Sequence, residues 1–140
     1  MKQAQEELDL KVGRERWVDD SDIKDQIYLQ AIVKETLCLY PPSPLSIPHE
    51  SMKDCHVCGY YVPKGSRVFV NVWKLHRDLR IWDDLDKFFP ERFLTKLANI
   101  DASGQHFEFV SFGSGRQSCP GYTFGLQVSH LTLALLLQRF

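Results

Sequence analysis

The chain has 140 residues, of which 44% are hydrophobic, 12% aromatic and 25% charged, which is the composition of a globular protein and excludes a disordered or fibrous one. A formal net charge of -1 at pH 7 gives no general electrostatic reason to expect nucleic acid or an anionic membrane as a partner. No stretch reaches the ~18 apolar residues of a membrane span, and the polar start predicts no signal peptide or anchor.

Residues 1–40 are predicted to be helical, in two pieces. The first runs from Met1 to about Leu10, and Val12-Gly13 ends it. Asp19 to Asp22 supply N-cap candidates for a second, possibly interrupted, segment that reaches Tyr40. Two prolines follow directly and stop it, because proline cannot continue a helix.

Residues 41–75 are predicted to be extended and then to form a β-hairpin. A proline-rich stretch covers 43–48, and two strands follow at 57–62 and 66–73, joined at Pro63-Lys64-Gly65. In the second strand valines alternate with other residue types, as in a strand whose two faces meet different surroundings. Residues 76–111 show no clean period and are expected to form an ordered meander.

Residues 112–140 combine a glycine-rich loop with a final helix. The loop ends in Cys119-Pro120-Gly121, and Pro120 is the residue type preferred at the first position of a helix. Cys119 is therefore predicted at a helix N-terminus, where free amides and the helix dipole favour the thiolate that ligates a metal. The helix from Tyr122 onward is apolar on nearly every face toward its end, which is typical of burial within a larger body.

The order of residues in this loop resembles the haem-binding signature FxxGxRxCxG of the cytochrome P-450 superfamily. Phe112, Gly115, Cys119 and Gly121 match it, whereas Gln117 stands where the family has arginine and Arg116 lies just upstream. The resemblance implies that Cys119 is the axial ligand of the haem iron. It also implies that the matching residues, with Arg116, contact the haem.

Two further elements of the same family occur in family order. The helical run around Glu35 resembles ExxR, with Cys38 in place of the arginine, and Pro90-Glu91-Arg92-Phe93 resembles PERF. The resemblance implies a structural ion pair between Glu35 and Arg92, since a guanidinium binds a carboxylate in a fixed geometry. Losing one arginine is expected to leave part of a buried Glu35 carboxylate without a partner.

The extended stretch from Pro44 to Glu50 matches the place where family members line the substrate pocket. They then offer a basic residue to a haem propionate, and His49 is the candidate here.

The resemblance covers almost the whole chain and is closest to plant microsomal members. It implies a mainly α-helical fold with small β-sheets, in which residues 1–140 form the incomplete C-terminal, proximal haem side of one domain. The full enzyme would take electrons from NADPH through a reductase and insert one oxygen atom into a small hydrophobic substrate, at the endoplasmic reticulum membrane. Because the oxygen-activating helix is missing here, no catalytic residue is assigned and the isolated chain is expected to hydroxylate nothing. Without an anchor, it is expected to be soluble and cytoplasmic.

Two other interpretations stay open. Cys55 and Cys58 form a CxxC pair, which is half of many zinc sites, but no second pair follows at usual spacing. The four cysteines are also too few and too irregularly placed for a disulfide scaffold, which predicts a reducing compartment. Alternatively, the chain is a noncatalytic degenerate fragment, since it departs from the family at the positions Cys38, Leu79, Ser111 and Gln117.

Overall fold

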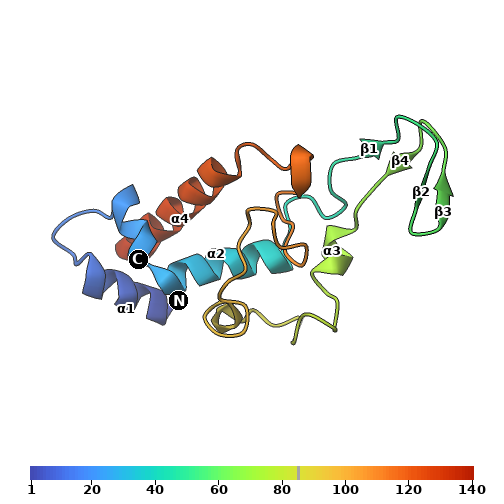
Figure 1. Ribbon diagram of the computed structural model, residues 1–140. Helices are drawn as coiled ribbons and strands as arrows, with labels where there is room; N and C mark the ends of the chain where they lie inside the picture. Colours follow the sequence, from blue (N-terminus) through green and yellow to red (C-terminus); the bar gives the residue numbers. More distant parts are fainter. Residues whose placement is uncertain (85) are drawn as a thin grey trace.

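The computed structural model describes residues 1–84 and 86–140. It contains a helical body, a small β-lobe that projects from one end of it, and a long irregular segment between the lobe and the last helix (Figure 1). This arrangement confirms the predicted fold class, mainly α-helical with small antiparallel sheets.

The helical body is built from α1 (Lys2–Lys11), the 3-10 helix η1 (Asp20–Asp25), α2 (Ile27–Leu39) and α4 (Tyr122–Arg139). The second predicted helical piece is indeed interrupted, at Gln26 between η1 and α2. Asp19 caps η1, because its side chain accepts a hydrogen bond from the Ser21 amide. The core between these helices consists of Ala4, Leu8, Val18, Ile23, Leu29, Ile32, Ala134 and Leu137.

The β-lobe differs from the predicted hairpin. The observed hairpin joins β2 (Cys55–Val57) to β3 (Tyr60–Val62), and its turn is Cys58-Gly59 rather than the predicted Pro63-Lys64-Gly65. Cys58 and Gly59 have φ of +49° and +85°, the left-handed conformation at both central residues that a tight two-residue hairpin turn uses. The two cysteines of the CxxC pair thus lie at the first residue of β2 and in the turn after it.

The predicted second strand also ends early. Only β4 (Arg67–Val68) is a strand, and it pairs with β1 (His49–Glu50) instead of with the preceding strand. Downstream, Asn71 caps the short helix α3 (Val72–Leu75) by accepting a hydrogen bond from the Lys74 amide at 2.8 Å. The prediction of one continuous strand from the alternating valines is therefore wrong, because Asn71 inside the pattern caps a helix.

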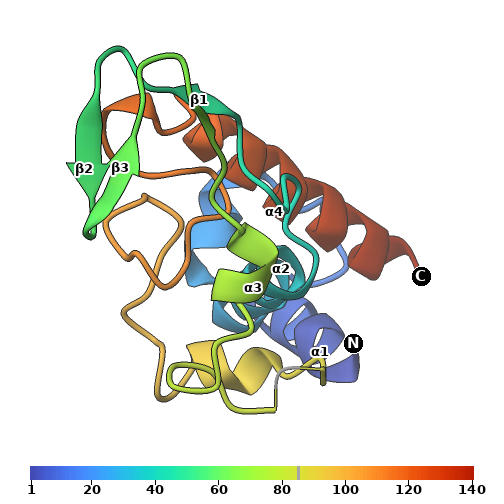
Figure 2. The same ribbon diagram turned by 90° about the vertical axis from the view of Figure 1, so that its right-hand side faces the viewer.

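Residues 76–84 and 86–111 are mostly irregular and include the short 3-10 helix η2 (Pro90–Phe93); this segment is called the meander below. η2 packs on α2, and η3 (Gly115–Gln117) follows in the cysteine loop. Beneath the meander lies a second core of Ala31, Cys38, Trp82, Phe93, Ala102 and Phe109. The orange η3 segment lies beside β1, as Figure 2 shows.

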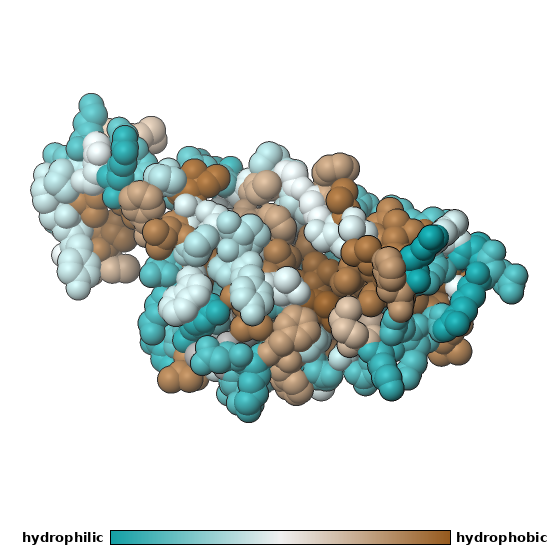
Figure 3. Space-filling view, turned by 180° about the vertical axis from the view of Figure 1, so that it is seen from behind, coloured by the Kyte–Doolittle hydropathy of each residue, from teal (hydrophilic) through white to brown (hydrophobic). Residues whose placement is uncertain are grey.

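The molecular surface carries much apolar area. Figure 3 shows apolar side chains gathered across the middle of the rear face of the helical body. Phe124, Val128 and Leu136 on α4 are 72%, 46% and 52% exposed, so several apolar residues of this helix face solvent instead of a core. Among the helices of the described residues, not one has the length and apolar character needed to span a bilayer.

Candidate functional site

Cys119 lies in a loop held by its own backbone. The Cys119 amide donates a 2.9 Å hydrogen bond to the Phe112 carbonyl, and the Gly113 amide donates one of 3.0 Å to Val110. Gly113 and Gly115 have φ of +78° and +69°, which glycine adopts without the steric penalty of a Cβ. These turns leave the Cys119 side chain exposed.

The last helix begins at Tyr122 as predicted, but Pro120 is not its first residue and Cys119 is not its N-cap. The first helical residue of α4 is Tyr122, and Pro120-Gly121 form a turn that is closed by a 3.3 Å hydrogen bond from the Tyr122 amide to the Cys119 carbonyl. The Cys119 amide also has a partner of its own in Phe112. Cys119 therefore lies just before the helix, outside its first turn.

A hollow of about 510 Å³ lies next to this loop, and its lining is mainly apolar. Phe112 and Cys119 of the cysteine loop and His49 of β1 are among the residues that line it. A larger hollow of about 740 Å³ lies at the opposite end of α4, but charged side chains such as Arg14 and Asp9 line it and no cysteine does. The hollow beside Cys119 is therefore the candidate functional site.

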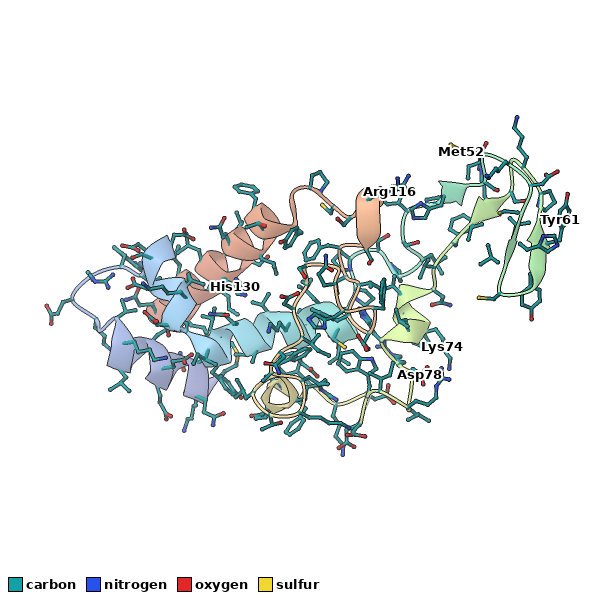
Figure 4. All side chains as sticks on the ribbon, in the orientation of Figure 1. Met52, Tyr61, Lys74, Asp78, Arg116 and His130 are labelled. Atoms are coloured by element: carbon teal, nitrogen blue, oxygen red, sulfur yellow. The ribbon has the colours of Figure 1, made fainter. Side chains whose placement is uncertain are left out.

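The predicted haem contacts do not all reach this hollow. His49, Phe112 and Cys119 border it, whereas Gly115, Arg116 and Gly121 are absent from its lining. Arg116 is an exposed residue of η3 (Figure 4), and its neighbour Gln117 borders the hollow in its place. The replacement of the family's arginine thus falls at a position that borders the site.

The structure brings Glu35 and Arg92 together beneath the meander. Both side chains are buried, and Arg92 Nε lies 2.9 Å from Glu35 Oε2. The other guanidinium nitrogens donate to main-chain carbonyls of the meander, among them Asp83 and Lys87. The ion pair therefore joins α2 to η2 and to the turn that precedes it.

The expected unsatisfied carboxylate is not observed. Glu35 Oε1 accepts a 2.9 Å hydrogen bond from the Phe89 amide and a 3.3 Å one from Arg92 Nη2. Burial raises the pKa of the Glu35 carboxyl, while the Phe89 amide and Arg92 oppose that rise. The Phe89 amide thus donates to the carboxylate oxygen that a second arginine would otherwise bond.

Cys38, at the position of the missing arginine, is a buried neutral thiol. Its side chain is 4% exposed, and burial, followed by the nearby Glu35 carboxylate, raises the pKa of the thiol to about 12. Cys38 therefore contributes apolar packing to the second core and no charge to the ion pair.

Sequence reasoning missed the side chains that hold the end of α2. The last three carbonyls of this helix accept side-chain hydrogen bonds: Leu37 from Ser111 Oγ at 3.2 Å, Cys38 from His76 Nδ1 at 3.1 Å and Leu39 from Arg77 at 2.9 Å. Helix-terminal carbonyls lack intrahelical partners, so these bonds satisfy groups that burial would otherwise penalise. These bonds hold the end of α2 to two segments, the residues directly after α3 through His76 and Arg77 and the residues before the Cys119 loop through Ser111.

The burial of His76 predicts a specific loss of stability in acid. Burial lowers the pKa of His76 from 6.5 to about 4, against the Cys38 hydrogen bond, and the adjacent Arg77 adds to the lowering. Between pH 6.5 and 4 the His76 imidazole is protonated in the unfolded chain but remains neutral in the folded chain. The free energy of unfolding therefore falls as the pH drops toward 4. The expected loss is roughly 3 kcal/mol.

Urea unfolding at several pH values would measure this loss in the unmodified chain and in His76→Phe. Other titrating groups are common to both chains, so the His76 contribution is the difference between the two pH profiles. Equal slopes between pH 6.5 and 4 would contradict the assignment. His56→Phe, which makes the same replacement at an exposed position of β2, is the control for the substitution itself and should change the free energy of unfolding at pH 7 by less than about 0.5 kcal/mol.

The residues at the hollow fit a haem group on two structural observations. The Cys119 thiol is exposed at the edge of an apolar hollow, which suits a flat, largely apolar ligand with a metal at its centre. His49 offers a polar side chain at the same hollow. By contrast, the described residues contain no cluster of three or more histidine, cysteine or carboxylate side chains that could hold a zinc ion through Cys55 and Cys58.

Comparison with known proteins gives a consistent result. A family model described as Cytochrome P450 matches residues 1–140. The chain is 61% identical over 140 residues to vinorine hydroxylase from Rauvolfia serpentina and 61% identical over 140 residues to nicotine N-demethylase CYP82E3 from Nicotiana tomentosiformis. It is 55% identical over 141 residues to xanthotoxin 5-hydroxylase CYP82C4 from Arabidopsis thaliana. These alignments cover 100% of the chain but 29%, 27% and 27% of the three relatives, so the chain spans less than a third of their length.

Solved structures show the same likeness. A zebrafish cytochrome P450 structure with progesterone superimposes with a TM-score of 0.88 at 37% identity, over 99% of this chain and 31% of that one. A second structure, with abiraterone, gives a TM-score of 0.85 at 36% identity, over 98% of this chain and 30% of that one.

Proposed function

The chain belongs to the cytochrome P450 family, and we propose that its part in the family's chemistry is to bind haem through the Cys119 thiolate. The observation that carries this proposal is the exposed Cys119 side chain at the edge of an apolar hollow of about 510 Å³. A thiol in such a place serves no packing purpose, because it contacts solvent instead of a core. Its use as a metal ligand explains both its exposure and the backbone bonds that hold its loop.

Each residue around the hollow has a proposed role. Phe112 packs along the hollow and against the second core, which excludes water from the cysteine side of the site. His49 is placed to donate a hydrogen bond to an acidic group at the rim. The Glu35 and Arg92 pair holds α2 against the meander and touches no part of the hollow.

Bound haem would supply the iron at which oxygen is activated, and a thiolate ligand increases the electron density that favours O–O cleavage. We assign oxygen insertion to the longer proteins that this chain resembles, with electrons delivered from NADPH by a reductase at the endoplasmic reticulum membrane. The relatives are named for their action on vinorine, nicotine and xanthotoxin, so the substrate class we propose is a small organic molecule. We propose that the 140 residues alone bind haem but do not hydroxylate a substrate.

Haem titration of the purified chain tests this proposal. Haem should bind the unmodified chain in a one-to-one complex, and reduction under carbon monoxide should give the red-shifted Soret band of thiolate ligation. Cys119→Ala should lose that band, because no other cysteine borders the hollow. Residual haem in this variant should show an ordinary, unshifted band.

Cys58→Ala is the matched control, since Cys58 is also an exposed cysteine but lies in the β2–β3 turn. This variant should keep the shifted band in full. If Cys119→Ala retains the band, or Cys58→Ala loses it, the ligand has been assigned to the wrong residue. Zinc that depends on Cys55 and Cys58 in the purified chain would favour a metal-binding interaction module instead.

A further inference from the structure

His76 connects two segments that are far apart in sequence. Its ring is 2% exposed and lies between Cys38 at the end of α2 and Val110 at the start of the cysteine loop. Nδ1 lies 3.1 Å from the Cys38 carbonyl oxygen, and Nε2 lies 3.2 Å from the Val110 amide nitrogen. Phe109 packs on the ring with a centroid separation of 5.5 Å.

These two partners determine the protonation of the ring. A carbonyl oxygen only accepts, so Nδ1 must carry the hydrogen, and a main-chain amide only donates, so Nε2 must present its lone pair. His76 is therefore a neutral imidazole in the Nδ1–H form. In an imidazolium, the Nε2 hydrogen would face the Val110 amide hydrogen. In the Nε2–H tautomer, the Nδ1 lone pair would also face the Cys38 carbonyl oxygen.

From Val110 the hydrogen bonds continue to the candidate ligand. The Val110 carbonyl accepts from the Gly113 amide at 3.0 Å, and the Phe112 carbonyl accepts from the Cys119 amide at 2.9 Å. Ser111, between them, is bonded to the Leu37 carbonyl at 3.2 Å. The cysteine loop is thus attached to the end of α2 through the segment that His76 holds.

We propose that His76 is a positioning residue, which places the Cys119 thiol at the edge of the hollow by joining the cysteine loop to the end of α2. The proposal rests on the function proposed above, that Cys119 ligates haem iron. His76 is absent from the lining of the hollow, so it acts through Val110 and the loop and does not contact the haem.

Three substitutions separate hydrogen bonding from packing. His76→Phe keeps a ring of similar size and loses both hydrogen bonds. His76→Gln places an acceptor near the Nε2 position and can retain the Val110 bond, while His76→Asn places a donor near Nδ1 and can retain only the Cys38 bond. His56→Asn, at an exposed position of β2, is the control.

The measurements are amide hydrogen exchange at Val110 and Cys119, the ring tautomer by nitrogen-15 NMR at pH 7, and haem affinity. His76→Phe should speed exchange at both amides by at least about tenfold. It should weaken haem binding by up to about 10–100-fold, the loss that follows removal of a group bonded to the metal ligand itself, because His76 acts on Cys119 only through Val110 and the loop. His76→Gln should be affected less than His76→Phe, and His56→Asn should not change.

A packing role would give the reverse order, with the aromatic His76→Phe closest to the unmodified chain, and that order would overturn the proposal. If the variants do not fold, the tautomer of His76 in the unmodified chain still tests the proposal. An Nε2–H ring or an imidazolium at pH 7 is incompatible with the hydrogen bonds to Cys38 and Val110 and would overturn it. Failure of the unmodified chain to bind haem would refute the proposed function alone. The tautomer and the exchange rates would then still test the link between His76 and the loop.

Discussion

Replacing Arg92 by methionine should lower the free energy of unfolding by about 3–5 kcal/mol, the usual cost of breaking a buried ion pair from one side. The Glu35 carboxylate is fully buried, and Arg92 supplies the positive charge that contacts it. Without the guanidinium, Oε2 loses its 2.9 Å partner and the Phe89 amide alone contacts the group. The meander carbonyls bonded by Arg92 lose their donors as well.

Urea unfolding of the variant measures this loss, and Lys96→Met is the matched control. Lys96 pairs with Asp83 at 2.8 Å, but both side chains are well exposed, so this change should cost less than about 1 kcal/mol. Combining Arg92→Met with Glu35→Gln should cost less than the sum of the two single changes, because the second removes the stranded charge. A loss under 1 kcal/mol for Arg92→Met would show that the pair does not hold α2 to η2.

Phe109→Ala should cost about 3–5 kcal/mol, which is typical of removing a buried aromatic ring from a core. Phe109 has no exposed surface and packs against Phe93 and His76, with ring centroids 5.6 Å and 5.5 Å away. Removal leaves a cavity at the point where the meander, η2 and the His76 bridge meet. Haem affinity should fall with stability, since Val110 follows directly in the chain.

Phe107→Ala tests the same chemical change two residues earlier in the sequence. Phe107 is 72% exposed, so its removal leaves no cavity and should change the free energy of unfolding by less than about 0.5 kcal/mol. Equal losses for the two variants would mean that the second core does not pack around Phe109 in solution. Thermal or urea unfolding followed by tryptophan fluorescence would report both, because Trp82 lies in that core.

The helices were more predictable from sequence than the strands. The start of η1 follows from its Asp19 cap, and the end of α2 at Tyr40 follows from the prolines after it, whereas the start of α2 at Gln26 has no side-chain cap to mark it. The Pro63-Lys64-Gly65 turn signal predicts the hairpin in the wrong place, and the paired register of β2 and β3 puts the turn at Cys58-Gly59. A polar cap at Asn71 likewise outweighed the alternation of valines.

The candidate site was predictable where a family motif carried it. The motifs led to Cys119, Glu35 and Arg92, and the last two form the buried pair. His76 and Ser111 were not found, because their partners are main-chain carbonyls 38 and 74 residues away, and carbonyls carry no sequence signal. The partner that completes the Glu35 carboxylate, the Phe89 amide, was missed for the same reason.

The central claim is that the Cys119 sulfur binds the haem iron, and X-ray absorption at the iron edge of the reconstituted chain tests it most directly. The spectrum of the unmodified chain should contain one sulfur scatterer in the first coordination shell of the iron. The spectrum of Cys119→Ala should contain only nitrogen or oxygen scatterers, and that of Cys58→Ala should match the unmodified chain. An iron without sulfur in the unmodified chain, or with sulfur still bound in Cys119→Ala, would contradict the claim.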